Sequence, residues 1–136
     1  MKRWTLSVSC LAAGFLLCTA CQSKLTIPQT AFLAMEGADH VTIHASAGQI
    51  KTIVETWRIQ KIAKLLQRFG DGWQQPWSGA PVPEVSFEFR KGQNLLANFG
   101  IGHGFVTTGA GQSWSQPLTD SDRAELLRLL GLQERQ

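Results

Sequence analysis

The chain begins with an apolar run that follows two basic residues. Lys2 and Arg3 precede a stretch of apolar or small uncharged residues from Leu6 to Leu17. A short basic segment followed by an apolar one is typical of an export signal. A helix needs about 20 apolar residues to cross a bilayer, so this run is too short for a permanent transmembrane anchor. The sequence therefore predicts that residues 1–20 are removed and take no part in the fold.

The apolar run ends in the segment Leu16-Leu17-Cys18-Thr19-Ala20-Cys21. This segment resembles the lipobox of bacterial lipoproteins, in which small residues precede a cysteine that receives lipid. Ala20 provides the small residue before the cleavage site, and Cys18 stands where the family usually has an aliphatic residue. The resemblance implies a diacylglycerol thioether on Cys21, with a further acyl chain, such as palmitate, on its amino group. The alternative is an ordinary secretory signal that is cleaved at a nearby small residue.

The resemblance also implies where the protein resides. In lipoproteins of Gram-negative bacteria, an Asp directly after the modified cysteine favours retention in the inner membrane, and here that residue is Gln22. We therefore expect a cell-envelope protein held by membrane lipid through Cys21, at the periplasmic face of the outer membrane if the bacterium is Gram-negative. Several acyl chains bind more durably than one. Residues 21–29 are expected to form the lipidated tether, and residues 30–136 a single domain.

The expected cleavage leaves no free thiol. Cys10 and Cys18 would leave with the signal, and the lipid would use Cys21. Disulfides are permitted in exported compartments, but this domain must be held by its hydrophobic core alone. After loss of Lys2 and Arg3, 11 basic residues stand against 10 acidic ones. A net charge this close to zero gives no support to a nucleic-acid partner.

Alternating polar and apolar residues predict an antiparallel sheet. One hairpin is expected from segments 40–45 and 49–54, and a second from segments 85–90 and 95–101. Two further short strands are expected at 105–108 and 112–115. The second hairpin and these two strands together predict an antiparallel meander.

Three segments have helical signals. Apolar residues recur three or four apart between Ile59 and Phe69, which predicts an amphipathic helix that ends at Gly70. Thr119 and Asp122 form a capping pair before a leucine-rich C-terminal helix. A helix of one or two turns, capped by Thr30, is expected over residues 30–36. The fold class that follows is α+β, with about five or six antiparallel strands and two helices over one face. In this arrangement the mature region is similar to many small envelope lipoproteins.

The three histidines of the mature domain do not predict a metal site. His40 and His44 share one face of a predicted strand, where four residues span about 13 Å. Two ligands of one zinc ion each lie about 2 Å from the metal, so this spacing is too long. His103 is far away in the sequence, and we expect neither a metal nor another cofactor.

Phosphate binding and catalysis also find little support. The segment from Gly100 to Gly104 has the glycines of a phosphate-binding loop, but a strand-like segment follows where that motif needs a helix. These glycines are expected to shape a bend or to allow a close approach of the backbone.

An enzyme remains the alternative: a small envelope hydrolase that uses His103 with Asp71 or a nearby serine such as Ser113. Any such convergence depends on the fold.

Tryptophan is the remaining signal. Residues 70–83, which we call the tryptophan loop, contain several glycines and prolines together with Trp73 and Trp77, and Trp114 follows near the end of the sheet. A Trp side chain presents a flat apolar face with one hydrogen-bond donor, which suits protein, peptide and sugar partners. We therefore predict a non-enzymatic binding module that contacts an envelope protein or the cell wall through these three residues. A tethered assembly factor with a constant partner is a related possibility. The tryptophans could instead close the loop over the core.

Overall fold

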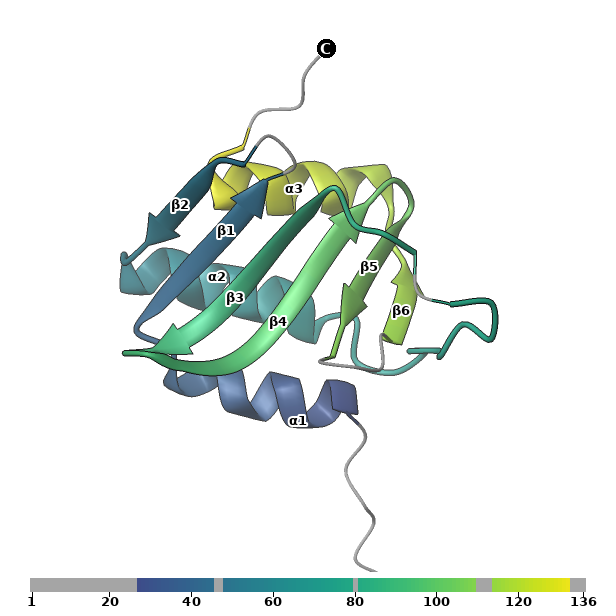
Figure 1. The fold of residues 1–136 in the computed structure, drawn as a ribbon, viewed down its shortest axis with the longest axis horizontal. Helices are drawn as coiled ribbons and strands as arrows, with labels where there is room; N and C mark the ends of the chain where they lie inside the picture. Colours follow the sequence, from purple (N-terminus) through teal and green to yellow (C-terminus); the bar gives the residue numbers. More distant parts are fainter. Residues whose placement is uncertain (1–26, 46–47, 80, 110–113, 133–136) are drawn as a thin grey trace, which may run out of the picture.

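The computed structural model describes residues 27–45, 48–79, 81–109 and 114–132 (Figure 1). Its elements in chain order are α1 (Ile27–Ala34), the 3-10 turn η1 (Met35–Gly37), β1 (His40–Ala45), β2 (Ile50–Ile53), α2 (Thr56–Gln67), β3 (Val85–Lys91), β4 (Asn94–Gly102), β5 (Phe105–Thr108), β6 (Trp114–Pro117) and α3 (Asp120–Leu130). The predicted α+β class is confirmed, and the expected strand 112–115 overlaps β6.

The six strands form one antiparallel sheet in the order β2-β1-β3-β4-β5-β6. The first hairpin pairs β1 with β2, as the alternation predicts. The chain then passes through α2 and returns in β3, which pairs with the other edge of β1. From β3 onward each strand pairs with the next one, which is the predicted meander. β1 therefore lies inside the sheet, although it is the first strand of the chain.

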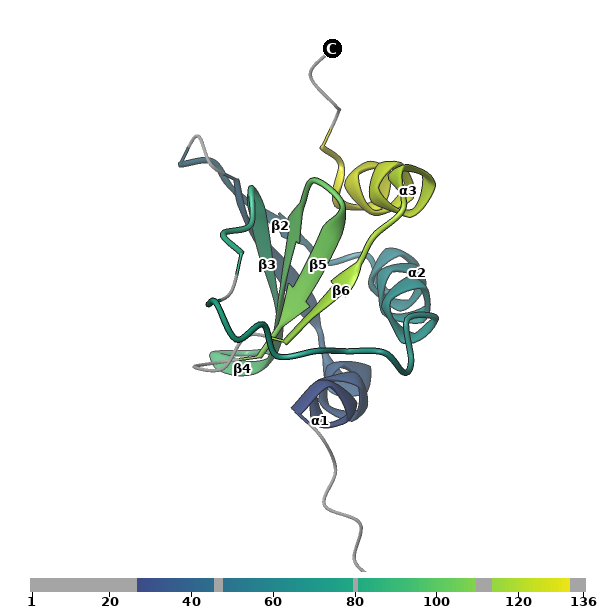
Figure 2. The same cartoon turned by 90° about the vertical axis from the view of Figure 1, so that its right-hand side faces the viewer.

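All three α-helices cover the same face of the sheet (Figure 2). The predicted arrangement has two helices on this face; the short helix predicted over residues 30–36 corresponds to α1, which packs on the same face as a third. It begins at Ile27, so the predicted start at a Thr30 cap is wrong, and residues 27–29 of the expected tether are helical. Pro28 accounts for this difference, because proline fits the first turn of a helix, where its missing N–H is not needed.

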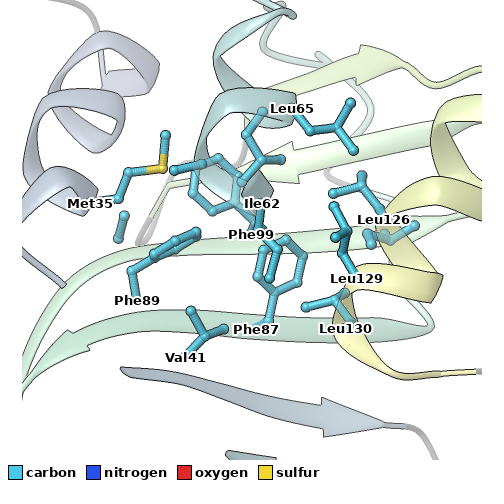
Figure 3. Packing of buried hydrophobic residues seen from close by; sticks show 14 of the residues in the cluster. Met35, Val41, Ile62, Leu65, Phe87, Phe89, Phe99, Leu126, Leu129 and Leu130 are labelled. Atoms are coloured by element: carbon cyan, nitrogen blue, oxygen red, sulfur yellow. The ribbon is translucent and has the colours of Figure 1, made fainter. Parts of the chain in front are cut away.

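The core fills the space between the sheet and the helices (Figure 3). Phe99 lies at its centre, with ring centroids 5.7 Å from Phe87 and 5.8 Å from Phe89. The apolar faces of α2 and α3 meet these rings through buried side chains such as Ile62 and Leu126. Each large apolar side chain that is fully buried contributes about 1.5–3 kcal/mol. The helical periodicity that identified α2 in the sequence is the spacing of its buried residues.

The ends of α3 follow the sequence signals. The Thr119 hydroxyl oxygen accepts a hydrogen bond from the backbone N–H of Asp122, with 3.1 Å between the heavy atoms. At the other end Gly131 has a φ of 68°, and the N–H of Leu132 donates to the carbonyl of Leu127 at 2.8 Å. This pattern is a Schellman cap, which satisfies carbonyls that the last helical turn leaves open. The predicted capping of this helix is confirmed.

Candidate interaction surface

The tryptophan loop joins α2 to β3 and is fastened to the rest of the domain. Gln74 and Ser115 exchange two backbone hydrogen bonds, of 2.9 and 2.8 Å, so the loop lies along the outer edge of β6. The side-chain nitrogen of Gln116 donates to the carbonyl of Asp71 at 3.2 Å. These bonds give the first part of the loop a defined place, and they cover backbone groups that an edge strand would otherwise expose.

Trp73 is turned toward the domain. Its ring packs against that of Phe32 in α1, with 5.9 Å between the centroids, and it borders the hydrophobic core. Its indole N–H is buried and has no hydrogen-bond partner among the described residues. Trp73 therefore closes the loop over the core, which is the second of the two roles considered from the sequence.

Trp114 is also directed inward. It pairs with Thr108 across β5 and β6, and Thr108 pairs with the core residue Phe99. Successive residues of a strand alternate between the two faces, so Trp114 lies on the face that the helices cover. Its side chain is half-buried, and its indole N–H has no hydrogen-bond partner within the described ranges. Trp114 is thus half-buried on the helix-covered face of the sheet rather than presented to solvent.

Trp77 differs from the other two. Its exposed fraction is 99%, the highest of any large apolar side chain in the described part of the chain, and Val82 in the same loop is 87% exposed. Trp77 lies between the fastened segment around Gln74 and the start of β3. Of the three tryptophans predicted to form a recognition surface, Trp77 alone is presented to solvent.

Three long segments of the chain contain no charged residue. Residues 25–35, 72–83 and 92–119 contain no Lys, Arg, Asp or Glu. Where these residues are described they form α1, most of the tryptophan loop, β4, β5 and β6, which we call the uncharged side; it lies toward the right and the bottom of Figure 1. Asp71, near the start of the loop, and Glu84, just after it, flank the uncharged segment 72–83. This grouping was present in the sequence, but only the fold shows that the three segments lie together.

His103 lies in the tight turn between β4 and β5 and pairs with Glu84, a partner that its place in the sequence does not indicate. Its Nε2 is 2.9 Å from Oε1 of Glu84, and Nη2 of Arg123 in α3 is 3.0 Å from Oε2 of the same carboxylate. Arg123 is only 13% exposed, whereas His103 is 78% exposed. The three side chains connect the start of β3, the β4–β5 turn and α3. Ser113, the serine named in the hydrolase alternative, lies outside the described residues.

The other two histidines lie on the sheet face that the helices leave open. Nε2 of His44 is 3.8 Å from Oε2 of Glu88, and the same oxygen accepts a hydrogen bond from Nε of Arg90 at 2.8 Å. His40 is four residues from His44 on the same strand and contacts Asp39. Among the described residues no three His, Cys, Asp or Glu side chains are grouped so that they could hold a metal ion.

Asp39 also stabilises the turn between β3 and β4. Its Oδ2 accepts a hydrogen bond from the backbone N–H of Gly92 at 2.9 Å. This bond, assisted by the contact with His40, holds the pKa of the Asp39 carboxyl below its usual value. The partners are distant in the sequence, and no local pattern indicated the contact.

The glycines at the end of β4 make room for side chains. A Cβ on Gly100 would lie 2.6 Å from Oγ1 of Thr107 and 2.7 Å from two side-chain carbons of Pro83. A Cβ on Gly102 would overlap the ring of Phe105. Both glycines lie within β4, which extends to Gly102, and β5 follows them, as the strand-like segment 105–108 predicts. They allow close contacts on the open face of the sheet.

Cys21, the expected lipid attachment site, lies outside the described residues. Within the described ranges no helix is long and apolar enough to span a membrane. Comparisons of the chain with protein-family models, with curated proteins and with solved structures found no match. The candidate site is therefore defined by the geometry of this domain alone, and it consists of the tryptophan loop and its surroundings.

Proposed function

We propose that the protein is an envelope lipoprotein, anchored through lipid on Cys21, whose domain is a non-enzymatic binding module. The observation that supports binding most directly is the exposure of Trp77, whose whole side chain is accessible to a partner. Trp is among the residues that contribute most to binding when a partner covers them, because its large ring removes much apolar area from water. The contact element of the module is the tryptophan loop.

The attachment of this loop favours binding. A loop that is already ordered loses less conformational entropy when a partner covers it, so more of the contact energy appears as affinity. The paired backbone groups of Gln74 and Ser115 and the packing of Trp73 on Phe32 provide this order for the first part of the loop. Trp77 follows three residues after Gln74, so its Cα lies within about 11 Å of that of Gln74.

The hydrolase alternative receives less support from the geometry. Both oxygens of Glu84 have partners, one in His103 and one in Arg123, which suits a structural link between three elements. The pair is also open to water at His103, whereas electrostatic catalysis is strongest where water is excluded. We therefore assign the Glu84–His103–Arg123 cluster to the stability of the domain rather than to chemistry.

The anchor is tested by substitution of the cysteines. Cys21→Ser is expected to abolish incorporation of a fatty-acid probe and to move the protein from the membrane fraction to the soluble fraction. Cys10→Ser is the matched control, because Cys10 lies in the apolar run outside the lipobox-like segment 16–21, and this variant should keep both properties. Continued labelling of Cys21→Ser would reject the anchor.

The binding role is tested in intact cells with a photo-crosslinking amino acid at position 77. Illumination is expected to join the protein to one envelope component in reproducible yield. The same amino acid at Gln60, an exposed position on the charged helix α2, is the control and should give no such product. Equal products from the two positions would contradict a specific role for the tryptophan loop.

A further inference from the structure

We infer that Trp77 and the uncharged side of the domain rest on the lipid surface that holds Cys21, so that the tryptophan loop is a second membrane contact. The inference depends on the proposed function, since it takes the anchor as given and names the partner of the same loop. The partner is the headgroup region of the bilayer rather than a protein. Three independent features lead to it.

The first feature is the length of the tether. Five residues separate Cys21 from Ile27, where α1 begins. A fully extended chain spans at most about 3.6 Å per residue, so the Cα of Ile27 lies within about 22 Å of that of the lipidated cysteine. Figures 1 and 2 both place this end of α1 on the side of the molecule where the tryptophan loop lies. The anchor therefore brings this side toward the membrane.

The second feature is the contact between the loop and α1. The rings of Trp73 and Phe32 are 5.9 Å apart, which fixes the beginning of the loop against the helix that follows the tether. Trp77 is four residues farther along the chain, so its Cα is within about 14 Å of that of Trp73. The tether and Trp77 can thus reach the same lipid surface without any rearrangement of the domain.

The third feature is the chemistry of this side. Trp is enriched at membrane interfaces, because its ring enters the apolar region while its N–H remains near water. Val82 and Leu33 add exposed apolar surface in the loop and in α1. The absence of Lys, Arg, Asp and Glu from residues 25–35 and 72–83 means that no charged side chain of these segments is desolvated at the interface.

The lipid anchor and the contact at Trp77 together set the orientation of the domain on the membrane. Acyl chains hold the protein at the membrane but leave the domain free to rotate about its tether. A second contact at Trp77 fixes which face is directed toward the lipid. The charged helices α2 and α3 and the open, polar face of β1 and β3 then remain accessible from the aqueous compartment.

Fluorescence quenching tests this arrangement with the full lipidated protein in vesicles of phosphatidylethanolamine and phosphatidylglycerol. A fraction of the lipids carries bromine on acyl carbons close to the headgroups, where it quenches only indoles at the interface. Wild-type protein is expected to be quenched, and Trp77→Phe to lose most of this quenching. The matched control is Trp57→Phe, which removes another exposed tryptophan, located in α2 beneath Lys61. The control should be quenched at least as strongly as the wild type.

The outcomes separate the inference from the proposed function. Quenching that is unchanged in Trp77→Phe, or lost in Trp57→Phe, would overturn the membrane contact. A specific protein crosslink at position 77 together with unquenched Trp77 would also overturn it, but would leave the binding module intact. A protein that carries no lipid on Cys21 would remove the anchor and, with it, this inference.

Discussion

The ring of Trp73 packs against the ring of Phe32, and this contact joins the tryptophan loop to the first helix of the domain. Both residues border the core without being part of its centre. Their contact explains how a long loop with many glycines and prolines keeps a defined place next to α1.

Trp73→Ala is expected to lower the free energy of unfolding by about 2 kcal/mol, from lost apolar burial and the lost aromatic pair. Urea denaturation followed by circular dichroism measures this change. Trp77→Ala is the matched control in the same loop. Because its ring makes so little contact with the domain, the control should remain within about 0.5 kcal/mol of the wild type. Equal losses in the two variants would show that the packing of Trp73 is unimportant.

Gly100→Ala is expected to destabilise the domain by about 1–3 kcal/mol, because the added methyl group would overlap Pro83 and Thr107 and force one of them to move. Gly37→Ala is the control, since the nearest atom to its new methyl group is a Leu96 carbon at 4.0 Å. Thermal unfolding of the two variants measures the difference, and the control should unfold at nearly the wild-type temperature. A stable Gly100→Ala protein would mean that the segment around Pro83 does not pack on the sheet.

Thr119→Ala is expected to cost about 1 kcal/mol, because the N–H of Asp122 loses the oxygen that caps α3. Thr56→Ala provides a comparison at the start of α2, where the N-cap residue Glu55 makes no side-chain capping bond. Since position 56 carries no cap, the comparison variant should unfold at nearly the wild-type denaturant concentration. The cap assignment fails if the two variants lose equal stability.

Asp39 is expected to make stability depend on acid. Its pKa is lowered in the folded protein, chiefly by the hydrogen bond from Gly92, so the folded state favours the ionised carboxylate. The resulting stabilisation is fully present above the unfolded pKa of about 4 and is lost as the pH falls through the folded pKa. Asp39→Asn should therefore lose less stability than the wild type between neutral and acidic pH. Titration of the Asp39 carboxyl by NMR gives the direction independently, and a pKa at or above the usual value would contradict it.

Much of the fold could be predicted because its signals are local. Alternating residues identified both hairpins, the spacing of Ile59 to Phe69 identified α2, and the Thr119 cap identified α3. The predicted start of the first helix is wrong, because Pro28 falls within the predicted tether and yet fits the first turn of a helix. Local patterns succeed where one turn or one pair of adjacent strands determines the structure.

The contacts around the candidate site could not be predicted, because they join residues that are distant in the sequence. Glu84 meets His103 and Arg123 only once β3, β4 and α3 are assembled. The exposure of Trp77 and the burial of Trp73 likewise depend on where the loop crosses α1 and β6. The sequence predicts a recognition surface of three tryptophans, but a side chain's residue type does not determine which way it faces.

The interior position of β1 has a consequence for how the chain folds. β1 pairs with β2 across a short turn, but each of its partners in β3 is at least 40 residues away in the sequence. Closing a long loop costs more entropy than closing a short one, and non-local pairing slows folding. The β1–β2 hairpin and the β3–β6 meander can therefore form early and separately. The junction between β1 and β3 is the step that completes the sheet, and a growing chain keeps one edge of β1 unpaired until Arg90 has followed.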